Sequence, residues 1–514
     1  MDHVIGVDIG TQSTKALLVD ASGRIVAQHS QGYQPDTPKP LWAEQWPAVW
    51  LDAVVACIAG CMASAAAAGV AAGDVKAVCI SSLYGGSGIP VDAQMRPLHP
   101  CLIWMDRRAE TEVAWVRRTI DLDRLYAITG NGVDSYYGFT KMLWLRNNRP
   151  EIWANTRYLL PPNAYVAWAL TGAVAVDHSS AGNIGGIYDT AARAWSREML
   201  AALGIPAAML PERLVASTDV VGGLLPEPAS RLGLAAGTPV VAGGVDAAVA
   251  TFAAGATRPG QHVAMIGTSM CWGYINQTVD ARHGLISMPH VFNGVRDNYV
   301  FGGAITAGAS VTWFVEQFCH AEAEAARATG GDPYPLLEAA ARALPAGSDG
   351  IVFLPYLMGE RSPVWDGRAS GAFVGLSLYH TRGHLYRAVL EGVSYALQHN
   401  IAAGALGAGG LEDRLIVVGG AAQSDLWMQI IADITNRPVD TIAENVEAAL
   451  GAALLAALGV GLVTPERAAG GWVTLVRRAT PQADAVRTYG RLFEVYTGLY
   501  PALKASMHRL RDAG

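Results

Sequence analysis

The first residues that could do chemistry form a short acidic strand followed by a polar turn. Val4–Asp8 is mostly β-branched and ends in a carboxylate, and a second strand-like run follows at Lys15–Asp20. The turn between them consists of Gly10, Thr11, Gln12 and Ser13. Its backbone N–H groups and hydroxyls suit the phosphates of a nucleotide, while the Asp8 carboxylate suits Mg²⁺ held through water. The alternative is an ordinary β-hairpin with a polar turn.

A similar unit recurs in the second half of the chain. His262–Ile266 is strand-like and leads into Gly267, Thr268 and Ser269, which repeats the first segment with a shorter turn. Two strand–turn units, one in each half, suggest a duplicated domain with a cleft between the copies. A plain turn is the alternative for the second unit, because Gly-Thr turns are common.

A third glycine turn lies further along the chain. Gly419 and Gly420 follow the strand-like run Arg414–Val418 and precede a helical segment. Such a turn leaves room for a planar base or a ribose against the backbone, with Ser424 as a polar contact. The alternative is a turn that only allows a strand and a helix to pack closely.

The elements that must position these turns alternate between strands and helices. A third strand precedes a long helix at Trp46–Ala68, and a strand at Val75–Ser81 follows, which is the beginning of a layered α/β domain. Later helices are expected over Ala247–Ala254, over a stretch ending near Glu324, and from His384 to about Asn400.

Composition limits the possible functions. A chain of 514 residues is too long for one core, so two large domains are expected. A net charge of −7 argues against a nucleic-acid partner. The six cysteines show neither a zinc spacing nor C-x-x-C, which favours reduced thiols in a cytoplasmic protein. The apolar runs Cys57–Gly73 and Ala448–Val463 fall short of the about 20 residues of a membrane span, and no signal peptide is expected at the N-terminus.

Six segments together identify a family resemblance. The chain resembles the FGGY carbohydrate kinases, most closely the xylulokinase branch, over nearly its full length. The matching segments are Gly6–Thr11, Trp104–Arg108, Gly243–Asp246, Ile266–Ser269, Phe353–Pro363 and Val418–Ser424 with Gln429–Asp433. The resemblance implies an α/β fold of two actin/hexokinase-like (ribonuclease-H-like) domains with a nucleotide and sugar cleft between them. We expect domain 1–245 to hold the sugar and the first phosphate loop, and domain 246–514 to hold ATP and the adenosine site.

The resemblance also implies roles for individual residues. Asp246 matches the catalytic base that accepts the proton of the sugar hydroxyl, although an Asp before a helix is also a favoured N-cap. Asp8 would hold Mg²⁺, and the three glycine turns would bind ATP. For Glu360 and Arg361 we expect an ion pair that pins a loop beside the cleft, and no catalytic role.

The identity of the sugar depends on a few residues of the first half. The expected substrate contacts, besides Asp246, are Leu83, Tyr84, Gly85, Trp104, Asp106 and Arg107. Glycerol kinases carry Arg-Glu at Leu83-Tyr84, which disfavours glycerol. Xylulokinases carry Met-His-Gly there and Asn after the base, where this chain has Ala247.

The expected reaction is therefore transfer of the γ-phosphoryl group of ATP to a terminal hydroxyl of a ketose, first of all D-xylulose, giving D-xylulose 5-phosphate. The alternatives are another pentulose or polyol, such as ribulose, erythritol or a deoxy-ketose, and a non-catalytic sugar sensor. A homodimer is possible, and neither a membrane nor a nucleic acid is expected as a partner.

Overall fold

The acidic strand that opens the chain lies in the middle of a mixed sheet. The computed structural model describes residues 2–279, 283–328, 330–407, 409–443, 448–469 and 472–513. The strands of the first sheet are β1 (His3–Ile9), β2 (Ser13–Asp20), β3 (Ile25–Gly32), β5 (Val75–Ser82), β13 (Val220–Gly223) and β14 (Pro239–Val241). They pair in the order β13-β14-β5-β1-β2-β3. Because β1 is antiparallel to β2 and parallel to β5, Asp8 lies between Lys15 and Ser81.

The second sheet repeats this arrangement. Its strands are β15 (His262–Ile266), β16 (Met270–Asn276), β17 (Ile286–Pro289), β18 (Asn298–Gly302), β21 (Leu415–Val418), β22 (Val439–Ile442) and β23 (Leu475–Ala479). They pair in the order β17-β18-β16-β15-β21-β22-β23. As β1 does with β2 and β5, β15 runs antiparallel to β16 and parallel to β21. The series β3-β2-β1-β5-β14 and β18-β16-β15-β21-β22 are therefore equivalent, which confirms the predicted duplicated α/β fold.

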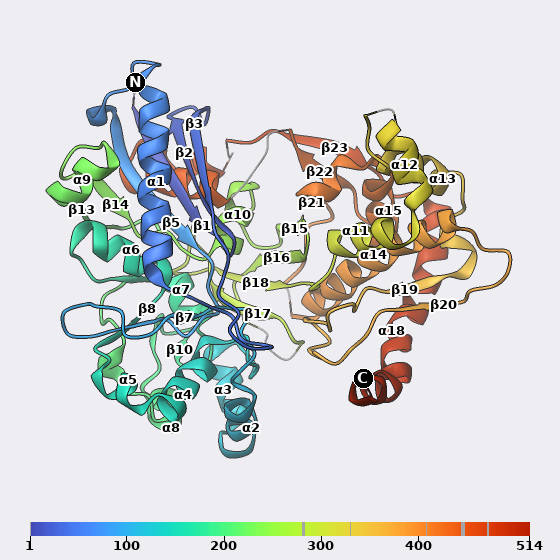
Figure 1. Cartoon of the computed structure of the whole chain (residues 1–514), viewed down its shortest axis with the longest axis horizontal. Coiled ribbons are helices and arrows are strands. Elements are labelled where there is room, and N and C mark those ends of the chain that lie inside the picture. The colour runs from blue at the N-terminus through green and yellow to red at the C-terminus, as the bar shows by residue number, and fades with distance from the viewer. Residues whose placement is uncertain are drawn as a thin grey trace.

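Helices cover both sheets (Figure 1). The first half contains α1 (Pro47–Ala66), α2 (Glu110–Thr119), α3 (Leu122–Thr129), α4 (Gly138–Asn148), α5 (Pro150–Asn155), α6 (Pro162–Thr171), α7 (His178–Asn183), α8 (Arg197–Leu203) and α9 (Pro226–Leu232). The second half contains α10 (Asp246–Ala253), α11 (Gly308–Phe318), α12 (His320–Ala328), α13 (Tyr334–Arg342), α14 (Arg382–Gly407), α15 (Asp425–Thr435), α16 (Ala448–Gly459), α17 (Pro465–Ala469) and α18 (Ala483–Ala513). Short strand pairs outside the main sheets are β4 (Glu44–Gln45) with β7 (Cys101–Leu102), β6 (Ile89–Val91) with β8 (Tyr158–Leu160), β9 (Val176–Asp177) with β12 (Leu214–Val215), β10 (Tyr188–Asp189) with β11 (Ala194–Trp195), and β19 (Val352–Leu354) with β20 (Ala372–Val374).

Helix α1 packs across the first sheet, against β2 and β3. Its buried face includes Trp50, Val54 and Ile58. The apolar segment Cys57–Gly73 was expected to be too short for a membrane span, but α1 begins earlier and its 20 residues reach the length and composition of one. That test is also passed by core helices of globular domains, and α1 packs as one here.

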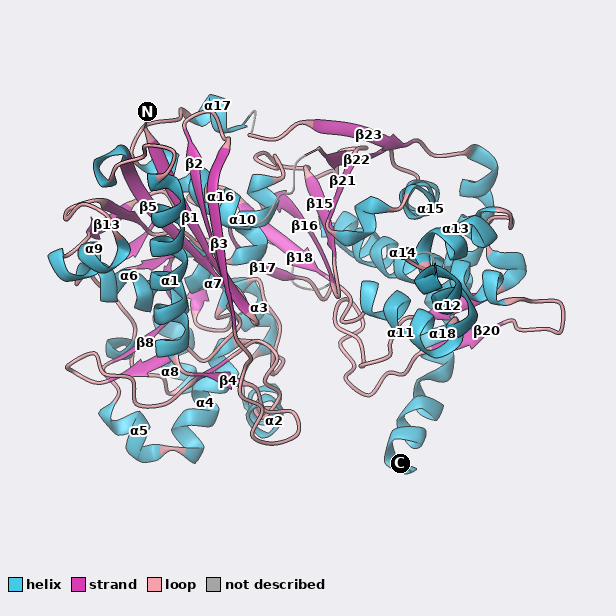
Figure 2. Ribbon diagram, turned by 45° about the horizontal axis from the view of Figure 1, so that its top comes forward, coloured by secondary structure: helices cyan, strands magenta, loops and turns pink. Residues whose placement is uncertain are grey.

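Helix α16 returns from the second half of the chain to the first sheet (Figure 2). It approaches β1 so closely that a Cβ on Gly6 would lie 2.0 Å from the Ala449 carbonyl oxygen. Val4 of β1, Val249 of α10 and residues of α16 share one hydrophobic core. The domain boundary expected at 245/246 would assign α10 and α16 to the second domain. In the structure, residues of both helices belong to the hydrophobic core that also contains Val4 of the first sheet.

Two predicted helix boundaries are wrong. The helix expected to reach Glu324 is two helices, α11 and α12, because the backbone of Cys319 leaves the helical region at φ −117° and ψ 41°. The helix expected to end near Asn400 continues to Gly407 as α14. The added turns are rich in alanine, which has the highest helix propensity.

Candidate active site

Asp8, together with Thr11 of the first polar turn, lines one side of a cavity of about 400 Å³. The Ser81 hydroxyl on the neighbouring strand donates to Asp8 Oδ1 at 2.9 Å, which fixes the carboxylate at the end of β1. The turn is closed by a 2.8 Å bond from Gly10 N to Ser13 O. The Trp104 indole N–H donates to Thr11 Oγ1 at 3.0 Å, and both residues line the cavity.

Asp246 faces the same cavity from the first position of α10. The preceding loop is held against β5, because Gly244 O accepts a bond from Ser82 N at 3.1 Å. Only glycine fits at Gly243, where a Cβ would lie 1.9 Å from Ile80 O. Val245, not Asp246, occupies the N-cap position, and Asp246 Oδ1 accepts a 2.7 Å bond from Ala247 N. Burial raises the pKa of the Asp246 carboxyl to about 6, against the opposing effect of that bond.

The second strand–turn unit closes the cavity opposite Asp8. Gly267, Thr268 and Ser269 all line it, and Gly267 N donates to Ser269 O at 3.0 Å. Helix α11 begins against this turn, because Gly308 N donates to Gly267 O at 2.9 Å and Ala307 N donates to Thr268 O at 2.9 Å. The N-terminal end of α11 therefore fixes the conformation of the turn.

A larger cavity of about 820 Å³ lies on the other side of this turn and shares Gly267 and Thr268 with the first. Gly420 and Ser424 line it, as predicted, and a Cβ on Gly420 would meet no atom within 4 Å. Gly419 serves close packing instead, since its φ is +94° and a Cβ there would lie 2.6 Å from Ile266 O. The Ser424 hydroxyl accepts a bond from Trp427 N at 3.1 Å and caps α15. The close-packing alternative therefore holds at Gly419, whereas a nucleotide contact at Gly420 and Ser424 stays a prediction.

The predicted sugar contacts divide into two groups. Leu83, Tyr84 and Trp104 line the 400 Å³ cavity, but Asp106 and Arg107 do not. Asp106 is fully buried and accepts bonds from Ala43 N at 2.7 Å and from Arg108 Nε at 2.8 Å. Arg107 forms an ion pair with Asp134. Gly85 packs behind the wall, where a Cβ would lie 2.9 Å from the Tyr136 ring.

Three predicted residues of the first turn, Gly10, Gln12 and Ser13, lie outside both cavities. Gln12 and Ser13 are exposed, and the Gln12 side chain donates to Gln34 Oε1 at 3.3 Å.

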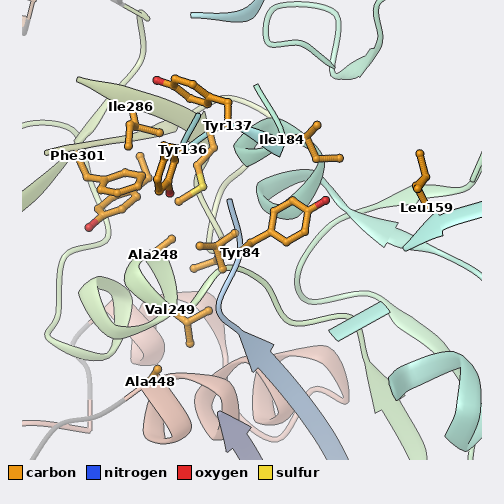
Figure 3. Close-up of a cluster of buried hydrophobic side chains, with 14 of the residues drawn as sticks. Tyr84, Tyr136, Tyr137, Leu159, Ile184, Ala248, Val249, Ile286, Phe301 and Ala448 are labelled. Carbon is orange, nitrogen blue, oxygen red and sulfur yellow. The ribbon is translucent and has the colours of Figure 1, made fainter. Parts of the chain in front are cut away.

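Sequence reasoning assigned no role in the site to several residues that line the cavity. Tyr136 belongs to a cluster of buried side chains that includes Tyr84 of the first half and Phe301 of β18 (Figure 3). Tyr136, Cys271 and Arg361 all line the 400 Å³ cavity. Tyr136 lies in a loop that follows the Gly130 cap of α3, and no local pattern distinguishes it from its neighbour Tyr137 as the ring that lines the cavity.

The predicted ion pair between Glu360 and Arg361 is wrong. The Arg361 guanidinium donates to the carbonyl oxygens of Met270 at 3.2 Å and Gly303 at 3.4 Å. Glu360 Oε1 instead accepts bonds from Ile305 N at 3.1 Å and Arg361 N at 2.7 Å. The two side chains therefore have different partners: Arg361 bonds at the start of β16 and just after β18, and Glu360 bonds shortly before α11.

Comparison with known proteins agrees with this geometry. Residues 3–253 match the N-terminal domain of the FGGY family of carbohydrate kinases, and residues 262–460 match its C-terminal domain. The chain belongs to the FGGY family of carbohydrate kinases. It is therefore a phosphotransferase that acts on a carbohydrate, as the sequence predicted.

Relatives of this FGGY kinase differ in the sugar for which they are named. It is 31% identical over 508 residues to the xylulose kinase of Bacillus subtilis (strain 168), covering 98% of each chain. It is 30% identical over 513 residues to the gluconokinase of the same organism, covering 99% of this chain and 98% of that one. The structure of ligand-bound xylulose kinase from Lactobacillus acidophilus superposes with a TM-score of 0.90 at 26% identity, covering 99% and 100% of the two chains.

Proposed function

We propose that the protein transfers the γ-phosphoryl group of ATP, with Mg²⁺, to a terminal hydroxyl of a ketose, D-xylulose being the first candidate. The observation that supports this most is the shared turn. Gly267 and Thr268 border both the small cavity with its two carboxylates and the large cavity with its glycine wall. A nucleotide in the large cavity would thus direct its phosphates past this turn toward an acceptor in the small one.

Asp246 is the proposed general base. Phosphoryl transfer needs in-line placement, charge neutralisation and a carboxylate that takes the hydroxyl proton. The rigid loop before α10 fixes Asp246 at the cavity wall. A carboxyl with a pKa of about 6 is ionised at neutral pH and is more basic than an ordinary aspartate.

Asp8 is the proposed Mg²⁺ residue. Mg²⁺ binds hard oxygen donors, keeps several waters, and commonly uses one or two carboxylates together with substrate phosphates. Asp8 and Asp246 supply carboxylates to one cavity, and the described residues contain no cluster of three or more metal-ligating side chains. This donor set fits Mg²⁺ bound mainly through water and phosphate. The bound ion would neutralise phosphate charge, while Ser81 keeps Asp8 oriented.

The wall of the small cavity supports a neutral polyhydroxy substrate. Trp104 and Tyr84 of the first half and Phe301 of the second offer aromatic surface to sugar C–H groups. Relatives of similar identity are named for xylulose and for gluconate, and we take the uncharged ketose as the first candidate because these rings suit sugar C–H groups. Arg361, which also lines the cavity, is the feature that would suit D-gluconate.

The experiment that tests the proposal is ADP release with Mg²⁺-ATP against D-xylulose, other pentuloses, polyols and D-gluconate. Selective turnover of D-xylulose is expected, and D-gluconate as the preferred substrate would refute the ketose assignment. Asp246→Asn should abolish turnover while ATP still binds. Asp189→Asn, which changes a carboxylate at the end of β10 and outside both cavities, is the matched control and should leave turnover unchanged.

A further inference from the structure

Arg361 places a positive charge in the cavity that holds both carboxylates. Its side chain is largely buried, with a relative exposure of 9%, and it borders the 400 Å³ cavity with Asp8 and Asp246. Among the described residues that line this cavity, it is the one lysine or arginine. Neither the predicted ion pair nor the base and metal roles above explain why a buried cation is held there.

The guanidinium is fixed beside the phosphate-binding turn. Its Nη2 donates to the carbonyl of Met270, the residue directly after Ser269, and its Nε donates to Gly303 O. Gly303 must be glycine for this placement, since a Cβ there would lie 2.7 Å from Arg361 Nη2. These bonds use Nε and Nη2 and leave Nη1 for a ligand in the cavity.

The loop that carries Arg361 is held from both domains. Ser362 Oγ accepts a 2.6 Å bond from Gly303 N. Trp365 packs against the rings of Tyr136 and Tyr137 in the first half of the chain, with centroids 6.4 Å apart in each case. Its indole N–H donates to Gly284 O at 2.6 Å. The guanidinium is thereby positioned before any substrate binds, which is what electrostatic catalysis requires.

The preceding carboxyl does not cancel this charge. Glu360 bonds to backbone N–H groups, and burial raises its pKa to about 8, so that it is mostly protonated at neutral pH. By contrast, Arg361 and Asp246 act on the same thiol. Burial raises the pKa of Cys271 to about 11, with Arg361 opposing the rise and Asp246 adding to it. Both side chains therefore lie near Cys271, on the wall of the same cavity.

We propose that Arg361 is a catalytic residue that donates hydrogen bonds to the oxygens of the phosphoryl group during its transfer. In that step the sugar hydroxyl oxygen bonds to the γ-phosphorus and its proton passes to Asp246. The bond from the γ-phosphorus to the bridging oxygen breaks, and ADP leaves with the electron pair. Charge is then spread over three phosphoryl oxygens, where a fixed guanidinium stabilises it. The inference rests on the proposed function, because it takes this cavity as the place of transfer.

The first test compares turnover of the wild-type protein with that of Arg361→Met and Arg361→Lys. Loss of one preorganised donor of this kind lowers kcat by about 100- to 1,000-fold. We expect that fall in Arg361→Met, with the KM values for ATP and sugar within about threefold, and partial recovery in Arg361→Lys. Arg368→Met is the control, since Arg368 lies in the same loop but pairs with Asp512 outside the cavity. A raised sugar KM with unchanged kcat would overturn the proposal and make Arg361 a sugar-binding residue.

The second test needs no sugar and separates catalysis from positioning. The wild-type protein should bind ADP with aluminium fluoride, a mimic of the phosphoryl group in transfer, more tightly than ADP alone. Arg361→Met should lose at least tenfold of that preference while its ADP affinity is unchanged. An equal loss for both ligands, or no loss, would overturn the proposal. Turnover remaining in Asp246→Asn would refute the proposed base without altering either comparison at Arg361.

Discussion

Replacing Asp246 by Asn should make the free protein more stable at neutral and alkaline pH while it abolishes turnover. The wild-type carboxylate is desolvated at the cavity wall, and its folded-state pKa is raised from 3.8 to about 6. At pH 8 it is ionised in both the folded and unfolded states, and burial makes the ionised form unfavourable only in the folded one. The Asn side chain removes this cost, and its amide oxygen can still accept the bond from Ala247 N.

The size of the effect follows from the pKa change. At about 1.4 kcal/mol per pKa unit, a rise from 3.8 to about 6 corresponds to about 3 kcal/mol at pH 8. Because the side chain is partly open to cavity water, we expect about 1–2 kcal/mol of added stability. As the pH falls through 6 the folded carboxyl takes up a proton, so the gain should be about half as large at pH 5 and vanish below about pH 3.8.

The assay is urea unfolding of wild type and Asp246→Asn at pH 8 and pH 5, without Mg²⁺ or nucleotide. Asp189→Asn serves as control and should show no gain at pH 8. A variant less stable than wild type at pH 8, or a gain that does not change with pH, would refute the assignment of Asp246 as a desolvated, strained carboxylate. The combination of higher stability with lost activity is the signature of a residue kept for function.

Three further outcomes test other parts of the site. The pH profile of kcat/KM should lose activity as the pH falls through about 6, where Asp246 takes up its proton; a limb near 4 would contradict the raised pKa. If Leu83 and Tyr84 determine the sugar specificity, exchanging them for Met and His should raise turnover of D-xylulose at least severalfold. Unchanged kinetics would show that other residues determine the specificity. Gly420→Val should raise the KM for ATP in a folded protein, as judged by circular dichroism, whereas Gly419→Val should lower thermal stability, because only Gly419 has a positive φ and a close backbone neighbour. Similar effects of the two glycine variants would contradict the separate roles of these glycines.

Local patterns predicted the strand–turn units because their information is contained in a few consecutive residues. A strand that ends in Asp8 and a strand that ends before Gly267 each point their turn at the same side of their sheet, and the duplicated topology brings the two together. The glycine turn at Gly420 is likewise visible in consecutive residues, and Gly420 does line a cavity. The glycine next to it, Gly419, needed the position of β15 to be understood, since its neighbour Ile266 is far away in the sequence.

Side-chain direction is what sequence reasoning lacked. Asp106 and Arg107 have the chemistry of sugar ligands, but the chain turns them toward Arg108 and Asp134, where their charges are paired. For Arg361 the reverse is true: it was expected in an ion pair that pins a loop beside the cleft, and it lines the cavity itself. Adjacent residues in an irregular loop have no periodicity that fixes which of them points inward.

The two halves of the chain supply different parts of the cavity wall, and we expect the first half to select the sugar. The shared turn at Gly267 and Thr268, with Arg361 beside it, belongs to the second half, and the phosphate contacts proposed for it do not depend on the sugar. Leu83 and Trp104 come from the first half and meet whatever the acceptor presents. Substitutions at Leu83 or Trp104 can change which sugar is accepted without altering the residues proposed to take part in phosphoryl transfer. A change of sugar within the family should therefore follow the residues around Leu83 and Trp104, while Asp246 and the shared turn stay as they are.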